Sequence, residues 1–334
     1  MKPNLSRRRF LSLSAGVTAL GLMPLPVFAT APLLRHWTGS AFGGPASIAI
    51  HYPDRAEADR LIGRCVAEIG RLEGIFSLYR PDSALSRLNR NGHLAAPPSD
   101  LVVLLSESIR FSRLTGGAFD VTVQPLWRLY TDHFSRTGAS ADGPDRDAVE
   151  RTLALVGYDG VRIDADRIAF TRPGMAVTLN GIAQGFITDR IATILRSGGC
   201  DSVLADLGEI RVLGTHPNGQ AWRIGLADPW VPDQIARTLE ITDRAVATSA
   251  ANGFQFDPSG RFHHLLDPAT GSSAGRYASV SVVARDATAA DALSTALTLM
   301  PIAEAERVLN AERGPMALFT HPDGGIQICK GAFS

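Results

Sequence analysis

The sequence is poor in cysteine and has no excess charge of either sign. Its 334 residues include only three cysteines, Cys65, Cys200 and Cys329, whose wide separation fits no metal-binding spacing. Their neighbours are apolar or small, which favours buried, inert thiols, although an oxidising compartment leaves open a disulfide between two of them. The 33 basic residues equal the 33 acidic ones, so we expect no nucleic acid among the partners.

Two familiar phosphate-binding patterns are also missing. The chain has no loop that ends in Gly-Lys-Ser/Thr and no Gly-x-Gly-x-x-Gly fingerprint, which excludes the common nucleotide-binding folds that depend on them. Beyond residue 30 no apolar run is long enough to cross a membrane. The remaining length, about 300 residues, is enough for one large domain with a sizeable core.

The first 30 residues have the layout of a twin-arginine signal peptide. Ser6-Arg7-Arg8-Arg9-Phe10-Leu11 fits the S-R-R-x-F-L pattern, an apolar stretch runs from Leu11 to Leu22, and small residues near Ala29 suit a signal peptidase. The alternative is that these basic residues stand by chance in front of a helix that is buried in the fold. We expect the twin-arginine (Tat) translocase to export the folded chain, which would be soluble in the periplasm after cleavage, with no lipid anchor indicated.

Hydrophobic periodicity after residue 30 predicts both helices and strands. Helices are predicted over 54–75, 101–114, 287–300 and 303–312, and strands over 47–52, 161–163, 167–170, 202–206, 222–227, 237–241, 279–284, 316–319 and 325–329. The segment 177–195 is predicted to begin as an apolar strand, turn at Asn180-Gly181 and continue as a helix. This mixed order predicts an α+β fold, with mixed or antiparallel sheets flanked by helices, in a single large domain over residues 31–334.

A carboxylate and two hydroxyls lie close together in the predicted helix over 287–300. Asp291 and Thr295 are four residues apart, so their oxygens face the same way, and Ser294 is one position round the helix. Such oxygens suit a hard cation such as Mg²⁺, which takes few protein ligands and keeps several waters. Alternatively, Thr295 bonds only to the helix backbone.

Three further motifs carry polar or aromatic groups next to turns. In Asn180-Gly181-Ile182-Ala183-Gln184-Gly185 a turn leads into a helix, where Gly181 could offer a carbonyl to a metal. In Gly116-Gly117-Ala118-Phe119-Asp120, Phe119 could stack on a flat ring and Asp120 could accept hydrogen bonds, although a core Phe and a capping Asp are equally typical. Adjacent His263 and His264 point to different sides of a strand, which disfavours a zinc site with Asp267.

The order of these motifs resembles the ApbE family of FAD:protein FMN transferases. The likeness runs from about Phe42 to the C-terminus and rests on five segments: Phe76 to Asn89 (F-S-x-Y-R-P-D-S-x-L-S-x-L-N), Gly116 to Thr122, Gly181 to Phe186, His264 to Gly271 and Ala290 to Thr295. A twin-arginine-exported branch associated with nitrous oxide respiration is similar in its Asn-Gly-Ile-Ala-Gln-Gly run.

The resemblance implies an activity, a metal and a set of site residues. The family uses Mg²⁺ to cut the pyrophosphate of FAD, releases AMP, and attaches FMN to a Thr or Ser hydroxyl of a periplasmic or membrane redox protein. That acceptor could belong to nitrous oxide respiration or to an ion-pumping oxidoreductase. By this resemblance Asp291, Thr295 and His264 would be catalytic, and the metal ligands would be Gly181, Asp291, Ser294 and Thr295. The FAD pocket would be lined by Phe42, Tyr79, Ala118, Phe119, Asp120, Thr178, Gln184, His264 and Leu265.

The chain departs from the family pattern at three positions. Thr178 stands where the family commonly has Asp, Gln184 where it has Lys, and Phe42 where Met is usual. Two alternatives stay open: an FAD hydrolase that yields FMN and AMP, with water in place of the acceptor, and a non-catalytic FAD-binding assembly factor whose catalysis has lapsed with Thr178 and Gln184. Asp291 and Thr295 argue against the assembly factor, since a carrier has less need of a metal. The base that would accept the hydroxyl proton stays open between Asp120 and Asp267.

Overall fold

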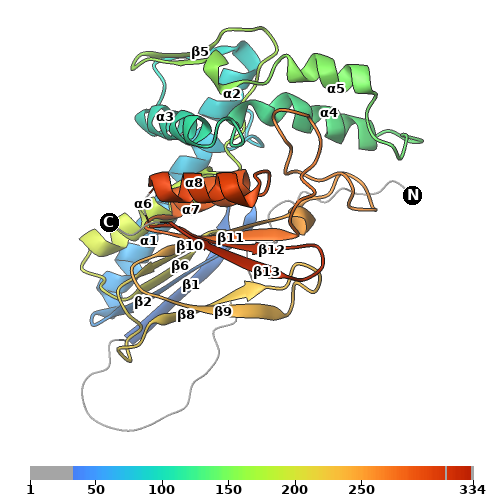
Figure 1. The fold of residues 1–334 in the computed structure, drawn as a ribbon. Coiled ribbons are helices and arrows are strands. Elements are labelled where there is room, and N and C mark those ends of the chain that lie inside the picture. The colour runs from blue at the N-terminus through green and yellow to red at the C-terminus, as the bar shows by residue number, and fades with distance from the viewer. Residues whose placement is uncertain (1–32, 313, 332–334) are drawn as a thin grey trace.

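An antiparallel sheet of eight strands organises the chain. The computed structural model describes residues 33–312 and 314–331, so the expected signal peptide lies outside the described residues (Figure 1). Neighbouring strands in this sheet all pair antiparallel. In spatial order the strands are β1 (Leu33–Ala41), β2 (Gly44–Tyr52), β6 (Val203–Asp206), β7 (Ile210–Leu213), β10 (Ala245–Ala250), β11 (Ser279–Ala284), β12 (Met316–Thr320) and β13 (Ile326–Lys330).

Each face of this sheet is covered by a different layer. Helices α1 (Arg55–Phe76), α6 (Ala183–Ser197), α7 (Ala287–Leu297) and α8 (Ile302–Glu312) lie on one side (Figure 1). On the other side lies a two-stranded sheet of β8 (Trp222–Ala227) and β9 (Ile235–Ile241). Its apolar side chains pack with those of β7, β10, β11 and β12 in a separate small core. Because both faces are buried, β7 and β11 are apolar or buried along their whole length.

The rest of the chain forms a cap above the helical layer (Figure 1). It contains α2 (Ala84–Asn91), α3 (Ser99–Leu114), α4 (Gln124–Phe134), α5 (Arg146–Leu153) and a small sheet of β3 (His93–Ala95), β5 (Arg167–Phe170) and β4 (Val161–Ile163). Three 3-10 turns, Val121–Val123, Tyr158–Gly160 and Ala251–Gly253, join these parts. An aromatic cluster holds α4 to the loop that follows β10, and includes Tyr130, Phe256 and Phe262.

Helices α1, α2 and α7 begin at capping side chains. Asp54 accepts a hydrogen bond from the N–H of Glu57 at 3.0 Å, and Asp286 accepts one from the N–H of Ala289 at 2.8 Å. The predicted stripe of α1 is buried at Leu61, Cys65 and Leu72. No helix of the described residues is both long and apolar enough to span a membrane.

The α+β fold is confirmed, and most of the expected elements are found within a few residues of their predicted bounds. All three cysteines are buried and free. Strands β1, β3, β7 and β10 and helices α4 and α5 were not predicted. The predicted strands over 222–227 and 237–241 exist, but they form their own sheet. The helix predicted over 287–300 ends at Leu297.

The apolar strand predicted at Val177 is wrong. Residues 176–180 have no strand partner, although Val177 and Leu179 are buried. Instead, the Asn89 side chain takes the place of a neighbouring strand. Its amide donates to the Val177 carbonyl at 2.8 Å, and its oxygen accepts from the Val177 N–H at 2.7 Å. These two bonds satisfy the buried backbone that a ladder would otherwise satisfy.

Candidate active site

A cleft gathers residues from nine separate parts of the chain. Its walls come from segments around 76–79, 118–123, 178–184, 208–209, 248–253, 264–268 and 291–299, with Phe42 and Trp127. All but one of the site residues predicted from the sequence line it: Phe42, Tyr79, Ala118, Phe119, Asp120, Thr178, Gly181, Gln184, His264, Leu265, Asp291 and Thr295. The exception, Ser294, is buried behind this wall.

Asp291 lies where the first turn of α6 meets α7. Its side chain is 3% exposed, and the N–H of Gly185 donates to its Oδ2 at 3.0 Å. Gly185 permits this approach, because a Cβ there would collide with the Ala287 carbonyl and lie 2.9 Å from Cβ of Asp291. Burial raises the pKa of Asp291 from 3.8 to about 7. A cation bound to the carboxylate would reverse this effect.

Three hydroxyl groups cluster one turn along α7 from Asp291, at the cleft floor. Thr295 is one turn along α7, and a Cβ on Gly181 would lie 2.9 Å from its Oγ1, so the Gly181 backbone approaches that hydroxyl closely. Ser249 on β10 was not predicted. Its Oγ lies 2.8 Å from Oγ of Ser294 and 3.4 Å from Oγ1 of Thr295. Ser294 also donates to the main-chain carbonyl of Asp291. Its contact with Ser249 therefore holds the Ser249 hydroxyl from the buried side of the cleft wall.

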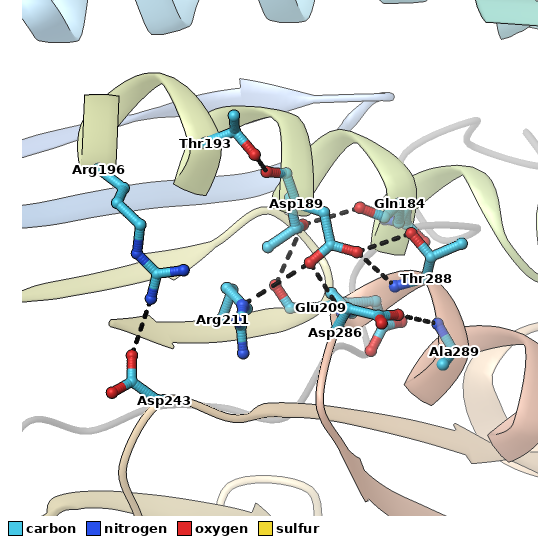
Figure 2. Close-up of polar contacts among 12 residues, drawn as sticks. Gln184, Asp189, Thr193, Arg196, Glu209, Arg211, Asp243, Asp286, Thr288 and Ala289 are labelled. Atoms are coloured by element: carbon cyan, nitrogen blue, oxygen red, sulfur yellow. Dashed lines mark hydrogen bonds and ion pairs between the residues drawn. The ribbon is translucent and has the colours of Figure 1, made fainter. Parts of the chain in front are cut away.

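A second aspartate fastens α7 to α6, as Figure 2 shows. Asp189 of α6 accepts from the N–H of Ala287 at 2.9 Å, and from the N–H and hydroxyl of Thr288 at 2.8 and 2.7 Å. It thereby satisfies N–H groups at the start of α7 that have no partner within the helix. Arg211 on β7 lies 3.8 Å away, across the same junction. These contacts fix the helix that carries Asp291.

Glu209 is a buried carboxylate on the cleft wall that was not predicted. It stands directly before β7, is 9% exposed, and lies on the cleft wall near the backbone N–H of Thr248. Burial and the nearby carboxylates Asp291 and Asp206 raise its pKa well above the usual value. Gly208 directly precedes Glu209. The Gln184 amide packs over Gly208, in the space that a Cβ on residue 208 would fill.

Aromatic residues form the outer part of the cleft. Phe42 adopts φ 52°, which is unfavourable for a residue with a side chain, and its N–H donates to Glu73 at 2.6 Å. Tyr79 is 53% exposed at the rim. Phe119 is 3% exposed and packs edge-on against Phe111, with 6.4 Å between the ring centroids, so most of its surface belongs to the core.

Asp120 braces the cleft wall. Its Oδ1 accepts from the N–H and hydroxyl of Thr122 at 2.7 and 2.5 Å, and its Oδ2 accepts from the N–H of Tyr158 at 2.9 Å. Burial raises its pKa despite these bonds. Asp267, the other carboxylate considered as a base, bonds to Ala269 and Thr270 within its own turn, and is not among the residues that line the cleft.

The two adjacent histidines point to different partners, as their places in the chain predict. His263 bonds to the Ala274 carbonyl at 2.6 Å, whereas Nδ1 of His264 lies 3.1 Å from the Phe254 carbonyl. Only a protonated Nδ1 can donate to that carbonyl, so the neutral His264 ring has its lone pair on Nε2. Burial lowers the pKa of His264 from 6.5 to about 4, which keeps the ring neutral at pH 7.

The pattern Gly-x-Ser-x-Gly occurs at Gly271–Gly275, but it does not form a nucleophile elbow. The Ser273 hydroxyl donates to the His263 carbonyl at 2.9 Å, and it accepts from the His263 N–H at 2.9 Å. No strand-to-helix turn surrounds it. Its role is to hold the His264 loop.

The donor set of the cleft suits a hard cation with few protein ligands. In the described ranges, no three His, Cys, Asp or Glu side chains come together as a metal site. Besides the carboxylates of Asp291 and Glu209, the cleft floor offers the hydroxyls of Thr295 and Ser249 and the backbone of Gly181. Mg²⁺ accepts such oxygens alongside water and phosphate. Fold and site together define an α+β enzyme with a carboxylate–hydroxyl centre at the floor of an open cleft.

Comparison with known proteins assigns this enzyme to a family. The ApbE family model matches residues 42–319. An FAD:protein FMN transferase of Vibrio cholerae is 30% identical over 301 residues, covering 87% of this chain and 89% of its own length, and one of Treponema pallidum is 31% identical over 280 residues, covering 78% and 76%. The chain therefore belongs to the ApbE family and is a flavin transferase.

Solved structures agree with this assignment. The flavin transferase ApbE from Vibrio cholerae has 27% identity and a TM-score of 0.76, over 90% of this chain and 97% of that one. The ApbE protein from Thermotoga maritima also has 27% identity and a TM-score of 0.76, over 89% and 97%. The likeness therefore includes both the sheet and the cap that enclose the cleft.

Proposed function

We propose that the protein transfers FMN from FAD to a Thr or Ser hydroxyl of an exported redox protein, in a Mg²⁺-dependent reaction that releases AMP. The observation that carries this proposal is the convergence of Asp291, Thr295 and Gly181 at the floor of the cleft. Asp291 would bind the cation through its carboxylate, Thr295 through its hydroxyl and Gly181 through its carbonyl. When bound, Mg²⁺ neutralises the charge of the pyrophosphate.

The reaction forms one phosphoester bond and breaks one phosphoanhydride bond. The acceptor hydroxyl oxygen attacks the phosphorus of the FMN half, and the bond to the AMP phosphate breaks. AMP leaves with the electron pair, and the hydroxyl proton passes to a base. The role of the chain is to hold the two reacting oxygens in line and to stabilise the charge.

His264 is the best-placed base for the hydroxyl proton. The ring lines the cleft, and its hydrogen bond to Phe254 leaves the lone pair on Nε2. Both oxygens of Asp120 are already occupied by Thr122 and Tyr158. The negative charge of a bound pyrophosphate would raise the pKa of His264 and make it a stronger base.

FAD would extend along the cleft from Asp291 towards the aromatic rim. Phe42 and Tyr79 offer ring surfaces for the flat flavin or adenine. Thr178 and Gln184 would offer hydrogen bonds where the family commonly has an acid and a lysine. The twin-arginine pattern before residue 30 supports delivery of the folded enzyme to the periplasm by the Tat translocase, where a membrane redox complex such as that of nitrous oxide respiration would supply the acceptor.

An acceptor-labelling experiment tests the proposal. The purified protein is incubated with FAD, Mg²⁺ and a periplasmic flavoprotein domain that carries an acceptor threonine. We expect the acceptor mass to rise by one FMN, with an equal amount of AMP released. Asp291→Asn should lower the rate more than about 100-fold, since several kcal/mol of charge stabilisation is lost.

The control for this variant is Asp166→Asn, which changes an exposed carboxylate in the β4–β5 turn, outside the cleft. It should label the acceptor at the wild-type rate. AMP release without acceptor labelling would show a hydrolase, and FAD binding without AMP release would show an assembly factor. Either outcome contradicts the transfer reaction.

A further inference from the structure

Among residues 33–312 and 314–331, no arginine, lysine or histidine forms an ion pair with the buried carboxylate of Glu209. The charged groups that act on it most strongly are Asp291 and Asp206, both carboxylates. The nearest arginine along the chain, Arg211, is placed against Asp189. Burying one carboxylate beside another is unfavourable unless a cation or several hydrogen bonds compensate.

The protein offers the Glu209 carboxylate little compensation. Among the described residues, the backbone N–H of Thr248 is the group that favours its charged form, against burial and two neighbouring carboxylates. Glu209, Ser249, Thr295 and Asp291 all line the same cleft, where the Ser249 and Thr295 hydroxyls lie 3.4 Å apart. A carboxylate can accept about four hydrogen bonds, so Glu209 can accept more from a group bound in the cleft.

The side chain at position 184 does not supply the missing charge. Gln184 packs over Gly208 and borders the same part of the cleft. A cationic side chain at position 184 would bring a positive charge next to Gly208, the residue before Glu209. Because the Gln184 amide is neutral, position 184 supplies no positive charge to offset the carboxylates of Glu209 and Asp291.

We propose that Glu209 accepts hydrogen bonds from the water molecules on the cation at Asp291, and so acts as a positioning residue that raises the affinity for that cation. This inference rests on the Mg²⁺ site of the proposed function. Mg²⁺ gives up its waters reluctantly and usually keeps several of them. Outer partners of this kind typically change metal affinity by about 10- to 100-fold.

Metal binding by variants of the full chain tests the inference, with Mn²⁺ as a paramagnetic probe. We expect Glu209→Gln to weaken Mn²⁺ binding by about 10- to 100-fold, while Glu209→Asp recovers part of the loss. The matched control is Asp206→Asn, which removes a half-buried carboxylate near Glu209 that does not line the cleft. It should weaken Mn²⁺ binding by less than about threefold, as expected for a charge acting only at longer range.

Two further measurements separate this role from a structural one. Without metal, Glu209→Gln should bind FAD at least as tightly as the wild type, because it removes a negative charge near the pyrophosphate. Electron–nuclear double resonance should count the same number of waters on Mn²⁺ in both proteins. One extra water in the variant would make Glu209 a direct ligand and overturn the inference.

Failure of the inference and failure of the proposed function give different results. Unchanged Mn²⁺ affinity in Glu209→Gln, with tight binding by the wild type, would overturn only the role of Glu209. Absence of Mn²⁺ binding by the wild type would overturn the metal site itself. A thermal melt of Glu209→Gln at or above that of the wild type, the expected result, excludes misfolding as the cause of weaker binding.

Discussion

The N–H of Gly185 donates to Oδ2 of Asp291 at 3.0 Å, and this bond joins two helices that are far apart in the sequence. Gly185 lies in the first turn of α6, where N–H groups have no partner within the helix. Asp291 satisfies one of these groups, and its other oxygen is left for the cleft. The same contact therefore packs α6 on α7 and orients the carboxylate on which the proposed metal site depends.

Adding one methyl group at this junction should separate the two helices. A Cβ in Gly185→Ala would collide with the Ala287 carbonyl. We expect the free energy of unfolding to fall by about 1–3 kcal/mol, as for other overpacked sites, and Mn²⁺ affinity to fall with it. Chemical denaturation and metal titration measure the two effects.

The control is Gly70→Ala in α1, where an added Cβ meets nothing within 4 Å. It should raise the free energy of unfolding by about 0.5–1 kcal/mol, because alanine is the better helix former. A wild-type melt and metal affinity in Gly185→Ala would contradict the tight contact between α6 and α7.

Removing the charge of Asp189 should loosen the start of α7. Its two oxygens accept three hydrogen bonds from Ala287 and Thr288 (Figure 2). In Asp189→Asn one of these oxygens becomes an amide, which faces a donor that it cannot satisfy. We expect a loss of about 1–3 kcal/mol in the free energy of unfolding, measured by denaturant titration.

Asp243→Asn serves as the control for Asp189. Asp243 pairs with Arg196 at 2.8 Å, but both side chains are more than half exposed. Exposed pairs of this kind contribute about 0–1 kcal/mol, and Asn tolerates the positive φ of 50° found there. Equal losses of unfolding free energy in Asp189→Asn and Asp243→Asn would show that the Asp189 hydrogen bonds stabilise the fold no more than an exposed ion pair does.

Stability should depend on the protonation of His264. A histidine with a lower pKa in the folded chain binds its proton more tightly when unfolded, so the free energy of unfolding falls as the pH drops. For His264 this window runs from 6.5 down to about 4. His264→Gln should lose less stability across it than the wild type, by up to about 3 kcal/mol.

Denaturant titrations at several pH values within this window test the effect. His36→Gln, which changes an exposed side chain on β1, should keep the wild-type dependence on pH. If His264→Gln follows the wild-type curve as well, His264 is not buried as a neutral ring.

Ser249 should matter for turnover although no sequence motif identified it. Its hydroxyl lies between those of Ser294 and Thr295. Ser249→Ala removes a hydrogen bond worth about 0.5–1.5 kcal/mol, which corresponds to a loss of roughly 2- to 10-fold in kcat/KM. Acceptor labelling rates measure this.

Thr248→Val is the companion variant, since the Thr248 hydroxyl bonds to Ser281 at 2.8 Å rather than to α7. It should keep a rate within twofold of the wild type while leaving the backbone N–H near Glu209 in place. A Ser249→Ala rate equal to that of Thr248→Val would rule out a role for Ser249 in holding Thr295.

The sequence alone determined the secondary structure over most of the sheet and its main helices, and the positions of the cleft residues. Periodicity predicts α1 and α7 because one face of each helix is buried, and capping residues mark where they begin. The ordered motifs identified residues that the structure brings into one cleft, from Phe42 to Thr295.

Only the tertiary structure decided which groups meet across the chain. Val177 is as apolar as a buried strand residue, yet its backbone bonds to the Asn89 side chain, 88 positions earlier. Glu209 and Ser249 join the cleft floor because β7 and β10 pair beside α7. Local patterns register only the burial and turns of nearby residues. The charge balance around Asp291 depends on contacts between distant segments, which exist only once the sheet is formed.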